Sequence, residues 1–224
     1  MGKLVITIVV VSYFLGSIPF GYLLVRIFRG TDVRATGSGN IGATNVARTG
    51  SKGLAIATLL LDASKGYAAV ALALCLAERY RWGSTPQTSI YDVRLEPRIG
   101  SQTVFLLAAL AAFVAILGHV FTVWLRFKGG KGVAAAAGSF IALAPRAMLV
   151  VVVLFVVIVA LTRYVSLGSI VAGVAFPLCV WWLNPPERNS VAIVLLIAAS
   201  SLLIVIRHRD NIRRLLAGTE NRFR

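Results

Sequence analysis

The chain has 224 residues, of which 58% are hydrophobic and only 14% are charged, and its mean hydropathy is +0.84. A soluble domain of this length must hydrate its surface and has a much smaller apolar share, so this composition indicates an integral membrane protein. The net charge of +15 does not indicate a nucleic-acid-binding protein, because the basic residues cluster in connections and in the tail, where membrane orientation and anionic headgroups account for them.

Seven apolar stretches follow one another along the chain, and lipid allows only helices at such positions. We expect one all-α, polytopic membrane domain over residues 1–224, with spans at Leu4–Phe28, Gly53–Ala77, Thr103–Leu125, Val133–Ala144, Ala147–Leu161, Val165–Leu183 and Val191–Ile206. The fourth stretch is short. Pro145 and Arg146 would form a tight turn after it, or else the fourth and fifth stretches form one kinked element.

Most lysines and arginines fall on one side of these stretches, in the connections at 29–52 and 126–132 and in the tail at 207–224. The positive-inside bias predicts that this side is cytoplasmic and that the amino terminus lies outside. The long polar loop at 78–102 then lies on the outer face. It mixes both signs of charge, and we interpret it as a solvated connection.

The stretch GSGNIGATNVART at residues 37–49 combines small and hydrogen-bonding residues between two apolar stretches. It contains G-x-G-x-x-G, but a membrane span precedes it rather than a buried strand, so we reject a dinucleotide-binding motif. Backbone N–H groups at glycines ahead of a helix suit an anion, and an arginine adds a bidentate phosphate contact. The candidate ligands are Ser38, Gly39, Asn40, Thr44, Asn45 and Arg48. An ordinary flexible loop is the alternative.

A second stretch, GHVFTVWLRFKGGKGVA at 118–134, places Lys128 and Lys131 around Gly129 and Gly130. It lacks the spacing of a Walker A loop, yet lysines and glycines at a helix start again suit phosphate. Positive-inside anchoring is the alternative, although anchoring does not require the glycines. His119, just ahead, is expected to be a packing hydrogen-bonding residue rather than a base.

Five more polar residues stand at positions that suggest a role. Asp62 and Lys65 share a helical face inside the second stretch, where we expect an ion pair that supports the site. Ser166 begins the sixth stretch as a helix cap or a ligand. In the tail, His208 and Asn211 fall on one helical face, and an amphipathic anchoring helix is the alternative.

Three anion-suited segments on one face predict a phosphate pocket at the membrane surface. Cys75 and Cys179 lie in apolar stretches, and no carboxylate, histidine or cysteine cluster has the spacing of a metal site, so we expect no metal and no cofactor. A transporter of a phosphorylated small anion is the alternative function. It is disfavoured because the segments gather at one face and no inverted repeat is visible.

These motifs resemble the bacterial acyl-phosphate:glycerol-3-phosphate acyltransferases, the PlsY family. SGNIGATNVAR (38–48), GHVFTVWLRFKGGKGVA (118–134) and HRDNIRRLLAGTE (208–220) are similar to its three cytoplasmic motifs, in the same order. GSIPFGYLL (16–24), LDASKG (61–66) and RYVSLGSI (163–170) are similar as well. The 78–102 loop is longer than expected for the family, and WLRF at 124–127 departs from the usual aromatic–glycine–phenylalanine.

The resemblance implies seven helices with a cytoplasm-facing pocket in the bacterial inner membrane. It also implies transfer of a fatty acyl group from acyl phosphate to the sn-1 hydroxyl of glycerol 3-phosphate, giving lysophosphatidic acid and phosphate in the first acylation step of phospholipid synthesis. The partners are then these two substrates and membrane lipid, with no nucleic acid and no obligate protein partner. By motif position the site contains Ser38, Asn40, Arg48, Lys128, Ser166, His208 and Asn211, with Lys131, Asn45 and Glu220 close by.

The residue inventory fits this chemistry. The sequence has neither a G-x-S-x-G nucleophile elbow nor an H-x4-D pattern, so positioning and electrostatics are expected to carry catalysis. The hydroxyl proton is expected to pass to a phosphate oxygen of the substrate. His208 and His119 are the only conventional bases available.

Overall fold

The computed structural model describes residues 1–83, 98–185 and 189–222, and within these residues the chain is helical, without β-strands. The elements are α1 (Gly2–Ser17), α2 (Phe20–Arg29), the 3-10 turn η1 (Val33–Ala35), α3 (Ala43–Ala47), α4 (Lys52–Trp82), α5 (Ser101–Val120), the 3-10 turn η2 (Val123–Leu125), α6 (Val133–Leu143), α7 (Pro145–Thr162), α8 (Val165–Leu183), α9 (Val191–Arg207) and α10 (Arg209–Leu216). The all-α prediction is confirmed.

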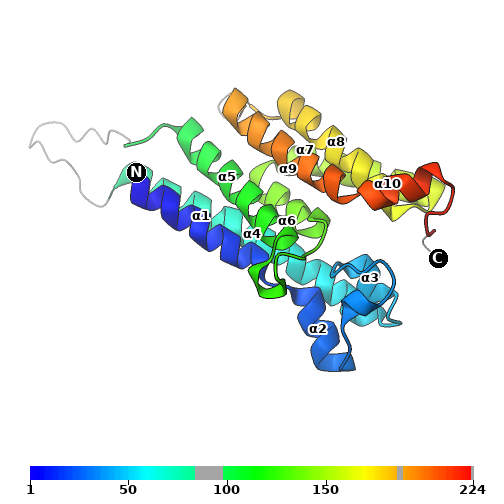
Figure 1. The fold of residues 1–224 in the computed structure, drawn as a ribbon. Helices are drawn as coiled ribbons and strands as arrows, with labels where there is room; N and C mark the ends of the chain where they lie inside the picture. Colours follow the sequence, from blue (N-terminus) through cyan, green and yellow to red (C-terminus); the bar gives the residue numbers. More distant parts are fainter. Residues whose placement is uncertain (84–97, 186–188, 223–224) are drawn as a thin grey trace, which may run out of the picture.

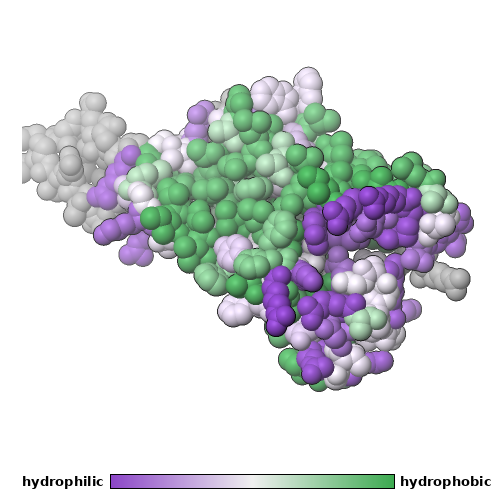
Figure 2. All heavy atoms as spheres, viewed as in Figure 1, coloured by the Kyte–Doolittle hydropathy of each residue, from purple (hydrophilic) through white to green (hydrophobic). Residues whose placement is uncertain are grey.

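The long helices lie alongside one another, whereas α2, α3 and α10 gather at one end of the bundle (Figure 1). With α1 and α2 counted together, five helical segments are long and apolar enough to cross a membrane, and α9 with α10, bent by 55°, would make a sixth. α6 is apolar but has only 11 residues, about half the length of a bilayer crossing. Figure 2 shows a broad hydrophobic surface along the helices, with hydrophilic residues gathered over α10 and at the neighbouring end. These features are those of an integral membrane protein.

The first apolar stretch is broken, although the sequence predicts one continuous span. α1 ends at Ser17 and α2 begins at Phe20, because Pro19 lacks an N–H donor and disfavours helical geometry in the residue before it. Two side chains from elsewhere in the chain, one in α4 and one just after α5, satisfy carbonyls freed at this break. Lys65 Nζ donates to the Ile18 carbonyl at 2.6 Å, and Thr122 Oγ1 donates to the Ser17 carbonyl at 2.5 Å.

Other predicted boundaries are also corrected by the structure. The predicted span to Leu125 agrees with the apolar segment Ser101–Leu125, although α5 itself ends at Val120 and the 3-10 turn η2 follows. The predicted turn at Pro145 and Arg146 is wrong, because the chain turns at Ala144 and both residues begin α7, where proline suits the first helical position. The fourth and fifth stretches are therefore separate helices. α4 extends to Trp82, so the predicted outer loop at 78–102 begins as helix, and its residues 84–97 lie outside the described residues.

Small residues allow close packing beneath the polar end. A side chain at Gly138 of α6 would overlap the carbonyl of Ala63 in α4, and one at Gly66 would overlap the carbonyl of Ala135. Backbones that approach this closely are typical of helix pairs in membranes. Phe140 stacks on Phe176, with ring centroids 4.1 Å apart, and joins α6 to α8. α6 is thereby fixed between α4 and α8, and so is the loop that leads into it.

Candidate functional site

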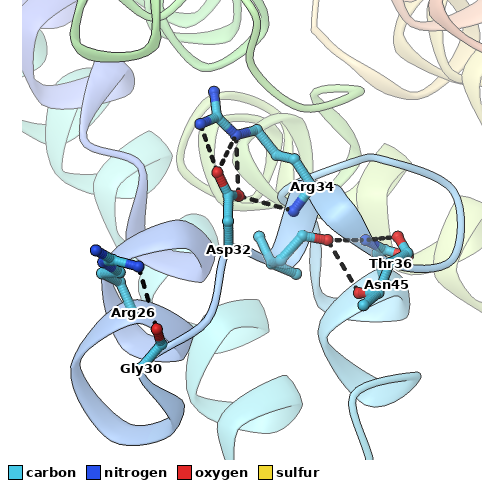
Figure 3. A network of polar contacts seen from close by, with 7 residues as sticks. Arg26, Gly30, Asp32, Arg34, Thr36 and Asn45 are labelled. Atoms are coloured by element: carbon cyan, nitrogen blue, oxygen red, sulfur yellow. Dashed lines mark hydrogen bonds and ion pairs between the residues drawn. The ribbon is translucent and has the colours of Figure 1, made fainter.

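The loop between α2 and α3 folds around the buried amide of Asn45 (Figure 3). The Nδ2 group donates to the carbonyls of Val33, Thr36 and Asn40 at 2.9, 3.1 and 2.7 Å. The Oδ1 atom accepts from the backbone N–H of Ser38 at 2.8 Å and from its hydroxyl at 3.2 Å. All of these partners belong to the same loop. The amide therefore stabilises the loop from within. The sequence predicts instead that Asn45 contacts the ligand.

Two glycines permit this loop conformation. Gly37 and Gly39 have φ values of 58° and 67°, a left-handed region that glycine adopts at little cost. A side chain at Gly37 would also overlap the Oδ1 atom of Asn45. The small residues therefore allow the backbone to wrap around Asn45, and Ser38 and Asn40 remain at the surface of the loop.

Asp32 and Arg34 form an ion pair at the start of the same loop. The Arg34 Nη2 and Asp32 Oδ2 atoms are 2.6 Å apart, and Figure 3 shows the two side chains facing one another. The hydrogen bond from the Arg34 side chain lowers the pKa of Asp32. Both side chains are about one-third exposed, so the pair lies at the edge of the site.

The segment at 127–131 folds back onto the end of α5. The Gly129 N–H donates to the Val120 carbonyl at 3.1 Å, and the Gly130 N–H donates to the His119 carbonyl at 3.0 Å. A side chain at Gly129 would overlap that same His119 carbonyl, and one at Gly130 would overlap the His119 ring. The paired glycines are therefore required for this packing, which holds the segment that carries Lys128 and Lys131 against the end of α5.

The tail is held by the carboxylate of Glu220. Its Oε1 atom accepts from Ser166 Oγ at 2.8 Å and from Asn211 Nδ2 at 2.7 Å. Its Oε2 atom accepts from Arg214 Nε at 2.7 Å. The Oδ1 atom of Asn211 in turn accepts from Lys131 Nζ at 2.5 Å. This chain of contacts joins α8, α10 and the 127–131 segment.

The loop at 32–40, the segment at 127–131 and the tail residues 206–214 line a cavity of about 610 Å³. Its lining residues are Asp32, Arg34, Ala35, Ser38, Gly39, Asn40, Phe127, Lys128, Gly129, Lys131, Ile206, Arg207, Arg209, Asp210, Asn211 and Arg214. Six of these are lysine or arginine and two are aspartate. Such a balance favours anionic ligands, and arginine donors suit phosphate oxygens in particular. Among the residues of the described ranges, no three histidine, cysteine, aspartate or glutamate side chains are grouped to hold a metal ion.

Burial changes the titration of three groups around the cavity. It lowers the pKa of Lys131 to about 8 and the pKa of His208 to about 4. Burial also raises the pKa of Glu220, but the hydrogen bonds from Asn211, Ser166 and Arg214 outweigh it and leave that pKa lowered. His208 Nδ1 lies 2.8 Å from the Ile204 carbonyl. Because a carbonyl only accepts, Nδ1 carries the proton, and Nε2 of the neutral ring is left as an acceptor.

The structure brings many of the predicted site residues to the cavity and places others behind it. The predicted residues that line it are Ser38, Gly39, Asn40, Lys128, Gly129, Lys131 and Asn211. Asn45, Ser166 and Glu220 support it from behind, as described above. The other residues predicted from these three segments do not line the cavity: Arg48, Thr44, Gly130 and His208.

The sequence reasoning missed several cavity residues in the tail. Arg207 and Arg214 line the cavity together with Asn211. On one continuous helix their spacing of four and seven residues would place all three on one side, and this pattern could have found them. In the structure Arg207 ends α9 and the other two lie on α10, which is bent by 55° relative to α9. Asp32 and Arg34 were also missed, and they carry no comparable signal. The expected ion pair is present, since Lys65 Nζ and Asp62 Oδ1 are 2.7 Å apart and both side chains are 2% exposed.

Comparison with known proteins identifies relatives along the whole chain. A family model described as glycerol-3-phosphate acyltransferase matches residues 6–218. The glycerol-3-phosphate acyltransferase of Geobacter sulfurreducens is 42% identical over 225 residues, covering 100% of this chain and 99% of the relative. That of Rhodopseudomonas palustris is 46% identical over 225 residues, covering 97% and 95%.

Two solved structures have a similar fold. Both are crystal structures of PlsY (YgiH), an integral membrane glycerol 3-phosphate acyltransferase, and both are 32% identical to this chain. The glycerol 3-phosphate form has a TM-score of 0.80 and covers 98% of this chain and 96% of that one. The lysophosphatidic acid form has a TM-score of 0.77, with coverage of 98% and 95%.

Proposed function

Because the chain belongs to the PlsY family of glycerol-3-phosphate acyltransferases, we propose that it transfers a fatty acyl group from acyl phosphate to the sn-1 hydroxyl of glycerol 3-phosphate. The products are lysophosphatidic acid and inorganic phosphate. One solved relative is described in a glycerol 3-phosphate form and another in a lysophosphatidic acid form, which supports this acceptor and this product.

The cationic cavity is the observation that carries the proposal. Both proposed substrates bear a phosphate group, and the lining supplies six lysine or arginine side chains from three separate segments. Its volume of about 610 Å³ is in the range of small-molecule sites. The cationic lining suits phosphate groups, and we propose acyl phosphate rather than acyl-CoA as the donor, as the resemblance to the family implies.

In the proposed reaction the sn-1 hydroxyl oxygen attacks the carbonyl carbon of the acyl phosphate. A new ester C–O bond forms, and the bond from that carbon to the phosphate oxygen breaks with its electron pair on phosphate. The hydroxyl proton ends on a phosphate oxygen. Since the leaving group is a good one, the cavity contributes chiefly by holding both phosphates close together and by stabilising the charge that develops on them.

Side chains at the cavity can be given roles in this reaction. The hydroxyl of Ser38 donates to Asn45, so its oxygen is left to accept from the substrate hydroxyl and to orient it. Lys128 and Lys131 hold phosphate as point charges, and Arg207 and Arg214 add planar donors. Burial lowers the pKa of His208 to about 4, so we expect its neutral ring to accept a hydrogen bond through Nε2 rather than to act as the general base.

Arg48 lies outside the cavity lining, yet its charge contributes to the low pKa of Lys131, so the two cations are near one another. We propose that Arg48 contacts phosphate through two parallel N–H donors once substrate enters. Arg48→Lys should then lose about tenfold in kcat/KM. Activity within about twofold of wild type would limit Arg48 to orienting the chain in the membrane.

The decisive experiment separates the donors. Purified protein in detergent is incubated with glycerol 3-phosphate and either acyl phosphate or acyl-CoA, and lysophosphatidic acid is measured. We expect product with acyl phosphate alone. Equal or greater turnover with acyl-CoA would overturn the proposed donor while leaving the acyltransferase assignment intact.

We further propose that the protein lies in the bacterial inner membrane with seven spans, an outer amino terminus and a cytoplasmic cavity, as the lysine and arginine distribution predicts. Single cysteines at Ser51, Arg222 and Gly2 test this in a chain whose Cys75 and Cys179 are replaced by alanine. An impermeant maleimide should label the first two only from the cytoplasmic side and the third only from outside. Labelling of the first two from opposite sides would overturn the seven-span arrangement.

A further inference from the structure

A cluster of three ionisable side chains lies buried behind the cavity and takes no part in the proposed chemistry. Asp62 and Lys65 of α4 are paired at 2.7 Å. The Nδ1 atom of His119, in the last turn of α5, lies 3.6 Å from the same Asp62 oxygen. All three residues are less than 5% exposed. Ionisable groups at such positions are costly, so this cluster calls for a function.

One side of the cluster supports the segment that carries the two lysines. The Gly130 N–H donates to the His119 carbonyl, and the Cα atom of Gly130 lies directly against the imidazole, where a side chain would overlap Nε2. The next residue is Lys131, which contacts Asn211 at 2.5 Å. The position of the His119 ring therefore sets the position of this segment.

The other side of the cluster supports the loop between α2 and α3, which carries Ser38. Lys65 Nζ donates to the freed carbonyl of Ile18 at 2.6 Å and lies 5.7 Å from the centroid of the Phe20 ring. The next residue, Gly21, packs so closely that a side chain there would overlap the carbonyl of Ile41. Lys65 therefore fixes the start of α2, and α2 in turn contacts the loop that carries Ser38.

We propose that Asp62, Lys65 and His119 are positioning residues that hold two walls of the cavity in register. Asp62 joins the two supports, because it pairs with Lys65 and faces His119. Lys65 fixes the start of α2 through the Ile18 carbonyl. His119 packs against Gly130 and so positions the segment that carries Lys128 and Lys131. The inference rests on the proposed role of these two lysines in holding phosphate.

A double-mutant cycle tests whether His119 positions the segment through its contact with Gly130. Binding of radiolabelled glycerol 3-phosphate to purified protein is measured for wild type, Gly130→Ala, His119→Ala and the double variant. The added methyl group overlaps the imidazole, so Gly130→Ala should weaken binding by about tenfold or more. In the His119→Ala background that space is free, and the same change should cost less than about twofold. Equal costs in both backgrounds would overturn the inference.

Gly129→Ala is the matched control for this cycle. Its methyl group would overlap backbone carbonyls of His119 and Val120 rather than a side chain, so His119→Ala should give no rescue. The thermal unfolding midpoints of the same variants follow the same cycle, because the overlap also destabilises the fold. They decide the outcome if His119→Ala alone binds too weakly. Rescue of Gly129→Ala as well would show general loosening and would count against a specific role of the contact between His119 and Gly130.

A second comparison separates positioning from the mere need for a buried ion pair. Lys65→Met removes the lysine partner of Asp62 and should destabilise the protein, whereas Asp62→Leu with Lys65→Met removes both charges and should restore the unfolding midpoint. Positioning predicts that this double variant folds normally but binds glycerol 3-phosphate at least about fivefold more weakly. Recovery of wild-type binding would reduce the pair to a structural role. Thr58→Val, another buried change in α4 whose hydroxyl bonds only within the helix, should leave binding unchanged.

Binding of glycerol 3-phosphate requires no acyl donor, so an error in the proposed donor does not affect these tests. Lys131→Met checks the premise separately. If it leaves binding unchanged, the proposed role of the lysines fails. If it weakens binding while the Gly130–His119 cycle is additive, the premise holds and the positioning inference fails.

Discussion

The loop at 32–45 and the tail at 207–222 are two walls of one cavity, yet they are held in opposite ways. Each is held by hydrogen bonds to a buried polar side chain, Asn45 in the loop and Glu220 in the tail. Asn45, a neutral amide, bonds only to residues within its own loop, at most 12 positions away. Glu220, a carboxylate, bonds to Ser166, which is 54 positions away, and its partner Asn211 bonds to Lys131, 80 positions away.

This difference indicates that the conformation of the tail, more than that of the loop, depends on the packing of other helices. The loop can adopt its conformation from local contacts, so it is preorganised for a ligand before the tail arrives. The tail reaches its place only when α8 and the 127–131 segment, which carry its partners Ser166 and Lys131, are already packed. Changes at the centre of the loop should therefore affect local stability, and changes at the tail should affect activity more than stability.

The largest effect is expected from Asn45→Asp. The new carboxylate would face three backbone carbonyls that now accept from Nδ2, and an unpaired buried charge costs roughly 3 kcal/mol or more. We expect a lower thermal unfolding midpoint in detergent together with nearly complete loss of turnover. A midpoint within about 2 °C of wild type would show that the loop is not built around this amide.

Asn211→Ala should come next and should differ in kind. It removes the acceptor for Lys131 and the donor to Glu220, so we expect a loss of roughly 100-fold in kcat/KM with a nearly unchanged unfolding midpoint. Specific activity is normalised to folded protein in the membrane fraction. Arg213→Ala, on the same helix but 81% exposed at the side chain, is the control and should change little. Near-normal activity of Asn211→Ala would return the tail to a membrane-anchoring role.

A pH titration gives an intermediate effect. The pKa of Lys131 is lowered to about 8 by burial, so its charge is lost as the pH rises through 8, while glycerol 3-phosphate remains a dianion. Affinity for radiolabelled glycerol 3-phosphate should fall by up to tenfold per pH unit above 8. Lys131→Arg should remove this decline, because arginine stays charged. A decline that persists in Lys131→Arg would assign it to another group.

The lowered pKa of Lys131 has the opposite effect on the free energy of unfolding, which rises with pH where the affinity for glycerol 3-phosphate falls. Between pH 8 and the unperturbed value of 10.5, the unfolded chain binds more protons at Lys131 than the folded chain does. The contribution of this residue to the unfolding free energy therefore rises with pH in that window.

The smallest effect is expected from Asp32→Asn in the loop. The Asp32–Arg34 pair is local and about one-third exposed, and exposed ion pairs contribute little to stability. We expect an unchanged unfolding midpoint and a change of less than about threefold in kcat/KM. A loss of tenfold or more would mean that Asp32 holds Arg34 in a position required for phosphate binding, and the loop would then depend on charge as the tail does.

Much of the site could be predicted from residue types, but the partners of these residues could not. Glycines next to lysines indicate phosphate binding, and Lys128, Gly129 and Lys131 do line the cavity. The same logic placed Asn45 among the ligands, although its amide is used within the loop, because residue type does not show where a side chain points. Arg207 and Arg214 were overlooked because the tail was compared with a membrane-anchoring helix.

The sequence by itself determined the membrane fold class and the Asp62–Lys65 pair. Hydrocarbon requires long apolar helices, and residues three apart on a helix are neighbours in any fold. Only the tertiary structure decided that the first apolar stretch breaks at Pro19 with Lys65 on the freed carbonyl, and that Glu220 joins Ser166 to Asn211. Such contacts join segments far apart in the chain, and their geometry depends on how whole helices pack, which no local pattern of residues specifies.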